Sequence, residues 1–545
     1  MIPDRPAKPS LPPAAPAEDA RTEPADRPIG LRRYARPATM FGRTRAVAAR
    51  AASGGKQGAL SGAMLFVISN MAYFAAAAIV PAHLLFAAEE HPLSVRLLTA
   101  IPAVLLVFEA RGFLKDESRE VPFVVLALFQ YYAAFCFGVF FELKFFDLFG
   151  PVNFTAEARL YGGIAVALGA VSIWGGAHLG RHVGRDLQRW VVAAMPPAEL
   201  PERWDSALLG YVGVTVMVTV LLIFVPSLIP GALTLPATYA FALEMALGLS
   251  LVAPSRKGGA LIPQVILGVF LVTGVLRGTL ESIFRGGIAY MTGRWVTARA
   301  VSFRIAVVVV ALYALLQPVK ASYRQQVWAP TARTGQSVGF ADRLLAWESA
   351  FSDYFSGRYD ESASEGGGRM ERLSEFSAVM HAFDVIPGRV AFIDGEGLLP
   401  IFYAPIPRFL WANKPTTRDT VQRYAIIFGR QTEEGARSTA INLPLLVEGY
   451  WNFGWPGIVL VTAALGFWVG LSQKVFAGEH WALRATGIAN ITNLTVAGPV
   501  VYVYSSVFQT VVGRAAVCWA VYWLATMLSR RRYDFTAKMH RAARR

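Results

Sequence analysis

The sequence has few charged residues and few cysteines. Only 16% of its 545 residues are charged and 54% are hydrophobic, whereas an ordinary soluble domain carries about 25% charge. That balance argues against a soluble protein. The two cysteines, Cys136 and Cys518, lie far apart in apolar segments, which argues against a disulfide framework. A β-barrel would show short alternating segments, and none dominate.

Motifs for nucleotide, acyl-transfer or metal chemistry are also missing. The chain has no P-loop, no G-x-G-x-x-G after a strand and no G-x-S-x-G elbow. His178 and His182 are four residues apart in "HLGRH", but no third ligand is near, so two histidines at a helix end are the preferred interpretation. We therefore expect no metal and no cofactor, and any energy source must lie in the substrate or in another protein.

Long apolar runs occur along most of the chain. A membrane-spanning helix needs roughly 20 apolar residues, and many of these runs come close to that length. The sequence thus predicts an all-α polytopic membrane protein. The expected spans are 62–87, 93–109, 121–141, 160–179, 207–229, 233–253, 261–279, 303–317, 455–476, 486–507 and 510–528.

Basic residues predict the orientation of the chain. The net charge of +15 comes largely from both termini and from two short loops, "EARGFLKDESRE" and "GRHVGRDLQR", and the positive-inside rule assigns these to the cytoplasm. This membrane explanation makes nucleic-acid binding unnecessary. About eleven spans cannot join two cytoplasmic termini, so 204–303 must hide a split, missed or re-entrant segment, and we expect ten to twelve spans.

Five regions follow from this topology. They are a disordered basic tail (1–58), N-terminal spans (59–319), an extracytoplasmic loop (320–453), C-terminal spans (454–528) and a basic cytoplasmic tail (529–545). The loop contains an amphipathic stretch at 341–359 and a second helical pattern at 369–386.

The long loop is rich in arginine, although the positive-inside rule disfavours cations there. Retained cations point to an anionic ligand such as phosphate, which suits the planar fork of arginine. The competing interpretation is that half or more of these arginines pair with carboxylates such as Asp384, Glu396 and Glu433 on an ordinary solvated surface.

Two stretches of the loop stand out from that surface. In "IPRFLWANKP" the prolines stiffen the segment that carries Arg408, Trp411 and Lys414, where an aromatic face lies beside cations. In "VEGYWNFGWPG" Glu448 lies at the mouth of a span, where an unpaired carboxylate is costly. The surrounding aromatics are also typical of an interfacial belt.

These stretches carry a family resemblance. Many spans, Ser255-Arg256 between two of them, then "PRFLWANKP", "RSTAINLP" and "EGYWNFGWPGI" resemble the Wzy-type O-antigen and exopolysaccharide polymerases, which join oligosaccharide repeat units. The motif-bearing part covers 389–471, and the rest resembles the family only in hydropathy.

The resemblance implies a metal- and nucleotide-independent glycosyltransferase at the outer face of the bacterial inner membrane. It would transfer a growing glycan from undecaprenyl pyrophosphate to an incoming lipid-linked repeat unit, with a chain-length regulator and a flippase as further partners. Cations would stabilise the departing diphosphate, and a carboxylate would deprotonate the acceptor hydroxyl or orient an arginine. The candidate substrate-binding residues are Arg408, Lys414, Arg437, Arg418, Arg256 and Trp411, and the candidate bases are Glu448 first and Glu396 second.

Three alternatives remain open. An O-antigen ligase would use the same donor with another acceptor, and a structural subunit would need no individual loop residue. A lipid-linked glycan transporter or flippase would show paired repeats, broken helices and polar groups at mid-membrane. The concentration of polar residues in one loop argues against transport.

Overall fold

The structure is a computed structural model. It describes residues 78–115, 120–140, 145–147, 150–224, 236–254, 259, 261–300, 302–317, 319–320, 322–324, 326–327, 338–358, 375–403, 406, 410–411, 413, 418–433, 443–495 and 513–529. The predicted N-terminal tail and nearly all of the C-terminal tail lie outside these residues. So do the first sixteen positions of the predicted span at 62–87, whose remainder contains a helix at 78–86.

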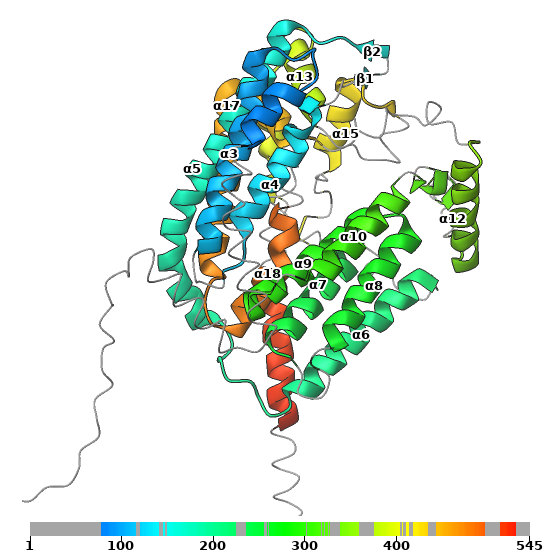
Figure 1. The fold of residues 1–545 in the computed structure, drawn as a ribbon. Coiled ribbons are helices and arrows are strands. Elements are labelled where there is room, and N and C mark those ends of the chain that lie inside the picture. Colours follow the sequence, from blue (N-terminus) through cyan, green and yellow to red (C-terminus); the bar gives the residue numbers. More distant parts are fainter. Residues whose placement is uncertain are drawn as a thin grey trace, which may run out of the picture. The chain divides into compact units, whose positions relative to one another are not determined.

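The first group of helices packs around α5, with α3, α4 and the later helix α17 beside it (Figure 1). α5 begins at a Thr155 cap, whose hydroxyl accepts a hydrogen bond from the N–H of Ala158 at 3.1 Å. A short antiparallel hairpin, β1 with β2, precedes it. The bounds are α3 (Leu93–Lys115), α4 (Phe123–Phe135), η1 (Phe137–Phe140), β1 (Phe145–Asp147), β2 (Gly150–Val152) and α5 (Ala156–Ala194).

A second group of helices packs around α7 and α9, with α18 among them (Figure 1). α9 is the helix that the hydropathy pattern missed, because Glu281, Arg285 and Arg294 interrupt its apolar sequence. It lies in the region where the span count failed. The bounds are α6 (Trp204–Phe224), α7 (Pro236–Val252), α8 (Leu261–Arg277), α9 (Leu280–Ala298) and α10 (Phe303–Leu316).

Short helices make up the described part of the 320–453 region. α12 is the predicted amphipathic helix, and it packs on the bundle: its Trp347 is buried, and the indole donates a hydrogen bond to Val275 O at 3.0 Å. Leu345 and Phe355 of the same helix remain exposed. The bounds are α12 (Phe340–Phe355), α13 (Phe376–Val385), η5 (Glu396–Leu398), α14 (Pro400–Tyr403) and α15 (Arg418–Ile427).

The last described helices of the chain are α17 (Leu445–Val475), α18 (Trp481–Thr495) and a helix at 513–529. Among the residues that the structure describes, five helices are long and apolar enough to cross a membrane, which fits the predicted multi-pass helical membrane protein. They are Leu93–Leu114, Phe123–Phe140, Ala156–Ala194, Trp204–Leu221 and Leu445–Val475, and shorter apolar helices are Ala242–Val252, Leu261–Arg277, Phe303–Leu316 and Phe376–Val385. Both cysteines are free and buried, as the sequence predicts.

A seam of small residues holds α5 against α17. On α5, a Cβ added to Gly184 would lie 2.8 Å from Leu471 O, and one on Gly176 would overlap the carbonyl oxygen of Ala463. From the other side, a Cβ on Gly470 would overlap Ala177 O. Because small residues four apart let two backbones touch, this seam supplies packing where lipid gives no hydrophobic drive.

Candidate functional site

The stretch "EGYWNFGWPG" folds as a tight helical hairpin inside α17. Phe453 and Gly454 leave helical geometry, and Gly454 has a φ of 63°, which favours glycine. A Cβ on Gly449 would lie 2.7 Å from Gly457 O and 2.8 Å from Val461 Cγ2. Residues eight apart in an unbroken helix are about 12 Å apart along its axis, so the arm at 445–452 must fold back on the arm at 455–475.

Glu448 lies in the short first arm and is fully buried. Neither of its carboxylate oxygens has a hydrogen-bond partner among the residues that the structure describes. An ionised carboxylate buried without a partner costs far more than a neutral acid. Glu448 is therefore poised to receive a proton, a cation or a hydrogen-bond donor.

A segment of the loop, residues 391–397, covers the tip of this hairpin. The Trp451 indole donates to Ala391 O at 3.1 Å, and Ile393 N donates to Trp451 O at 3.0 Å. Further along the loop segment, Gly397 N donates a hydrogen bond to Asn452 Oδ1 at 3.0 Å. Trp451 and Asn452 share the helix face of Glu448, at i+3 and i+4. The loop segment thus bonds to the two residues that lie one turn after Glu448 on the same helix face.

Asn452 also makes a hydrogen bond within its own helix arm. It is fully buried, and its amide nitrogen donates to Glu448 O at 2.8 Å. Gly395 lies at the same tip with a φ of 88°, and a Cβ there would lie 2.6 Å from the Phe453 ring. Residues 391–397 and the hairpin tip therefore pack against each other.

The other predicted site residues are either exposed or outside the described residues. Glu396 is exposed on this loop segment, and its carboxylate pairs with Arg423 Nη1 at 2.6 Å, as the solvated-surface interpretation expected. Trp411 is exposed, with its ring 6.1 Å from that of Tyr403. The remaining candidates, namely Arg256, Arg408, Lys414, Arg437 and the side chain of Arg418, lie outside the described residues.

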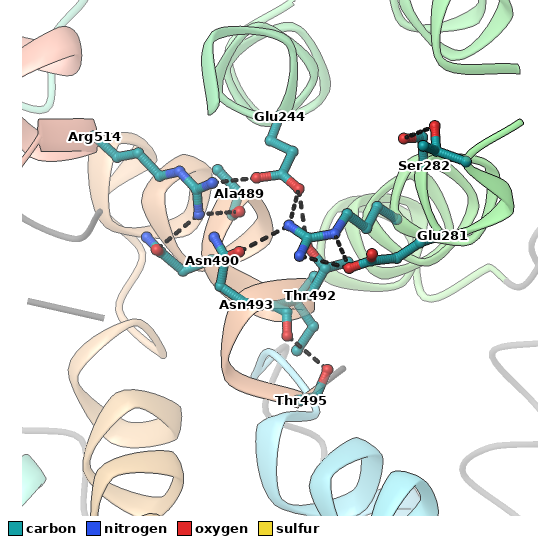
Figure 2. A network of polar contacts seen from close by, with 12 residues as sticks. Glu244, Glu281, Ser282, Ala489, Asn490, Thr492, Asn493, Thr495 and Arg514 are labelled. Carbon is teal, nitrogen blue, oxygen red and sulfur yellow. Dashed lines mark hydrogen bonds and ion pairs between the residues drawn. The ribbon is translucent and has the colours of Figure 1, made fainter. Parts of the chain in front are cut away.

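A polar cluster inside the helix bundle was missed by the sequence analysis. We call it the Glu244 cluster (Figure 2). Its members come from α7, α9, α18 and the helix at 513–529, and they are Glu244, Arg285, Asn490, Thr492, Asn493 and Arg514.

One half of the cluster centres on Arg514. The side chains of Arg514 and Glu244 are each 1% exposed, and Arg514 Nη2 donates to Glu244 Oε2. Arg514 Nη1 donates to Asn490 Oδ1 at 2.7 Å and also to Ala489 O. A charge pair this deeply buried is stable only when its other donors and acceptors are also bonded.

The other half centres on Arg285, which is 18% exposed. Its Nη1 donates to Asn493 Oδ1 at 2.9 Å and to Glu244 Oε1 at 3.4 Å, while Nε donates to the exposed Glu281 at 2.9 Å. Thr492 Oγ1 donates to Glu244 Oε1 at 3.0 Å. Two guanidinium groups thus share one fully buried carboxylate.

The sequence did contain a signal for this cluster. Glu244 in "YAFALEMALG" and Arg514 in "VVGRAAVCWA" are single charges within apolar runs, and such charges mark functional sites by default. Their presence corrects the premise that polar residues concentrate in one loop, because this cluster lies within the helices. The broken helix at Phe453 and Gly454 weakens the same argument against transport.

Comparisons with known proteins place the chain in a family. A family model described as a domain of unknown function (DUF8712) matches residues 199–477, just over half of the chain. The match includes Glu244, Arg285, Glu396 and Glu448, and it ends before α18. No curated protein and no solved structure matches. The chain therefore belongs to the DUF8712 family of domains of unknown function.

Proposed function

We propose that the protein is a membrane glycosyltransferase that polymerises lipid-linked oligosaccharide repeat units. The resemblance in 389–471 supports this activity, and one of the stretches that carry it, "EGYWNFGWPGI", forms the hairpin in α17. In the reaction, an acceptor hydroxyl attacks the anomeric carbon of the donor glycan. The bond to undecaprenyl pyrophosphate breaks, the diphosphate leaves with the electron pair, and a base takes the hydroxyl proton.

The buried carboxylate of Glu448 is the observation that carries the proposal. A general base must reach the hydroxyl, and Glu448 is fully buried in a helix arm whose Trp451 and Asn452 are bonded to the loop segment 391–397. The base role therefore requires that segment to move when a repeat unit binds. The loop arginines and lysine of the motif, Arg408, Lys414 and Arg437, would then hold the diphosphate, with Arg256 and Arg418 as further cations.

The topology of the proposal follows from α9. A crossing by α9 added to the eleven expected spans gives twelve, which returns both termini to the cytoplasm of a bacterial inner membrane. The region 320–453 and the hairpin tip would then face the outside, where lipid-linked repeat units are polymerised.

The activity is tested with purified full-length protein and undecaprenyl-pyrophosphate-linked repeat units, without nucleotide or metal. We expect a ladder of lengthening glycans on a gel. Glu448→Gln keeps the shape of the side chain but cannot take the proton, so the rate should fall about 10²- to 10⁴-fold. The control variant Glu433→Gln, on an exposed glutamate of the same region, should keep its polymerisation rate within about twofold of the wild type.

A full ladder from Glu448→Gln would rule out Glu448 as the base, and the absence of a ladder from the wild-type protein would refute the proposed activity. Transfer of a finished chain to a lipid acceptor would instead identify a ligase.

The second candidate is a transporter or flippase for lipid-linked glycans. The broken helix in α17 and the charged Glu244 cluster inside the bundle favour it specifically. Proteoliposomes containing a fluorescent lipid-linked glycan distinguish the two candidates. Movement of the probe between leaflets without any change in glycan length would support transport, and lengthening without movement would support the polymerase.

A further inference from the structure

Aromatic side chains gather where α5, α13, the loop segment 391–397 and the hairpin in α17 meet. We call this group the outer aromatic cluster, and its members are Tyr161, Phe383, Phe392, Tyr450 and Trp455. The centroid of the Phe383 ring lies 4.2 Å from that of Tyr450 and 5.0 Å from that of Trp455. The Tyr161 ring lies 6.0 Å from the Trp455 ring. Four separate segments of the chain thus contribute rings to one packed group.

Part of the cluster is open to a ligand. Tyr161 is 42% exposed and Phe392 is 37% exposed, whereas Tyr450 is buried. Each exposed ring rests on a more deeply packed one, because Tyr161 lies 5.9 Å from Phe383 and Phe392 lies edge-on to Tyr450 at 5.7 Å. Rings held by such contacts lose little freedom when a ligand stacks on them. The cluster therefore offers a preformed aromatic surface.

Charged side chains next to the cluster indicate what this surface binds. Asp384 directly follows Phe383, and Arg389 and Asp394 lie three residues before and two residues after Phe392. None of these three charges belongs to an ion pair within the residues that the structure describes. Unpaired charges are costly beside lipid tails, and two carboxylates repel a phosphate headgroup. A ligand with many hydroxyls suits them, because hydroxyls donate to carboxylates and accept from arginine.

We propose that the outer aromatic cluster binds sugar rings of the lipid-linked glycan by stacking. This inference rests on the proposed function and names the part of the substrate that this surface takes. Sugar rings have apolar C–H faces that pack on aromatic rings, while their hydroxyls bond to the flanking charges. Tyr450 belongs to the same short helix arm as Glu448. The sugar-binding surface is therefore built on the element that carries the proposed base.

Binding is measured on the full-length protein in neutral detergent, with protein titrated against a trace of labelled lipid. One probe is the undecaprenyl-pyrophosphate-linked repeat unit, and the other is undecaprenyl pyrophosphate without sugar. We expect the repeat-unit lipid to bind at least about tenfold more tightly, because only this lipid can place sugars on the cluster.

This measurement needs no turnover, so it is separate from the polymerisation assay. A ladder of glycans together with equal binding of the two lipids would refute the sugar-binding surface alone. Sugar-dependent binding without a ladder would refute the proposed activity alone.

Matched variants locate the sugar contact. Tyr161→Ala and Phe392→Ala should each weaken binding of the repeat-unit lipid about three- to tenfold and leave binding of the sugar-free lipid unchanged. Tyr161→Phe keeps the ring and should bind the repeat-unit lipid more tightly than Tyr161→Ala. Asp394→Asn should weaken binding of the same lipid about threefold, because it removes a charged acceptor. The control Trp190→Ala removes a ring that is 78% exposed near the other end of α5, and it should change either affinity by less than about twofold.

Two results would overturn the inference. The first is equal affinity of the wild-type protein for the two lipids, a comparison that needs no variant to fold. The second is an equal loss of affinity for both lipids in Tyr161→Ala and Phe392→Ala, because that would place the prenyl chain or the diphosphate on the cluster instead of the sugars.

Discussion

The glycine seam between α5 and α17 makes a prediction with an internal control. Gly175 and Gly176 are adjacent on α5, but only one of them faces α17. A Cβ on Gly176 would overlap Ala463 O and lie 3.0 Å from Phe467 N, whereas a Cβ on Gly175 would meet nothing within 4 Å. The same substitution to alanine should therefore have opposite effects at these two neighbouring positions.

The magnitude follows from two opposing contributions. Alanine in place of glycine within a helix stabilises it by about 0.5–1 kcal/mol, and both variants gain this equally. At Gly176 the new methyl group must push the α17 backbone away, and overpacking of this kind costs about 1–3 kcal/mol. We expect Gly175→Ala to unfold at slightly higher denaturant than the wild type, and Gly176→Ala to lose up to about 2 kcal/mol net. The difference between the variants isolates the packing cost.

Unfolding in mixed SDS and dodecylmaltoside micelles, followed by far-ultraviolet circular dichroism, measures these free energies. Gly184→Ala tests a second point on the seam, where the added Cβ would lie 2.8 Å from Leu471 O. If Gly176→Ala proves as stable as Gly175→Ala, the two helices do not touch at this seam and the packing described for α5 and α17 is refuted.

Three further predictions concern the loop and the hairpin. Burial raises the pKa of Glu375 from its ordinary 4.5 to about 7, against the opposing charge of Arg430, so the folded protein holds more protons than the unfolded chain between these pH values. Its free energy of unfolding should fall by about 1–3 kcal/mol as pH rises from 4.5 to 7, and Glu375→Gln should remove that decrease in unfolding scans at pH 5 and pH 8. Asn452→Ala should cost about 2 kcal/mol in the same unfolding assay, because buried Gly397 N and Glu448 O lose their partner, while the exposed Asn413→Ala should cost under about 0.5 kcal/mol. Arg408→Ala and Arg437→Ala should each abolish polymer in cells while protein level and membrane insertion stay unchanged, and long polymer from both variants would contradict the diphosphate role.

Most helices lie where the hydropathy of the sequence predicts them, and helix α9 is the exception. The expected spans at 93–109 and 160–179 lie within α3 and α5, and the one at 455–476 ends one residue beyond the long arm of α17. α9 was missed because its Glu281, Arg285 and Arg294 lower the hydropathy of the window. Those charges are tolerated because Glu281 and Arg294 are exposed and Arg285 finds partners on α7 and α18.

The two predicted bases, Glu448 and Glu396, also show what local sequence can predict and what tertiary contacts decide. Local sequence pointed to Glu448 as a costly carboxylate, and the structure places it in full burial. Local sequence also favoured Glu396 as a second base, yet this residue is exposed and paired with Arg423. The exposure of a residue depends on which segments pack over it. The segment 391–397 precedes the helix arm that it contacts by some fifty residues in the sequence.

The sequence by itself determined the protein's class, because membrane hydropathy accumulates along each helix without help from distant residues. It also predicts the long arm of α17 as the apolar run at 455–476, but it does not predict the hairpin turn at Phe453 and Gly454. Only the tertiary structure joined Glu244 to Arg514, which are 270 residues apart. Contacts of that kind depend on which helices become neighbours, and no local periodicity encodes that choice.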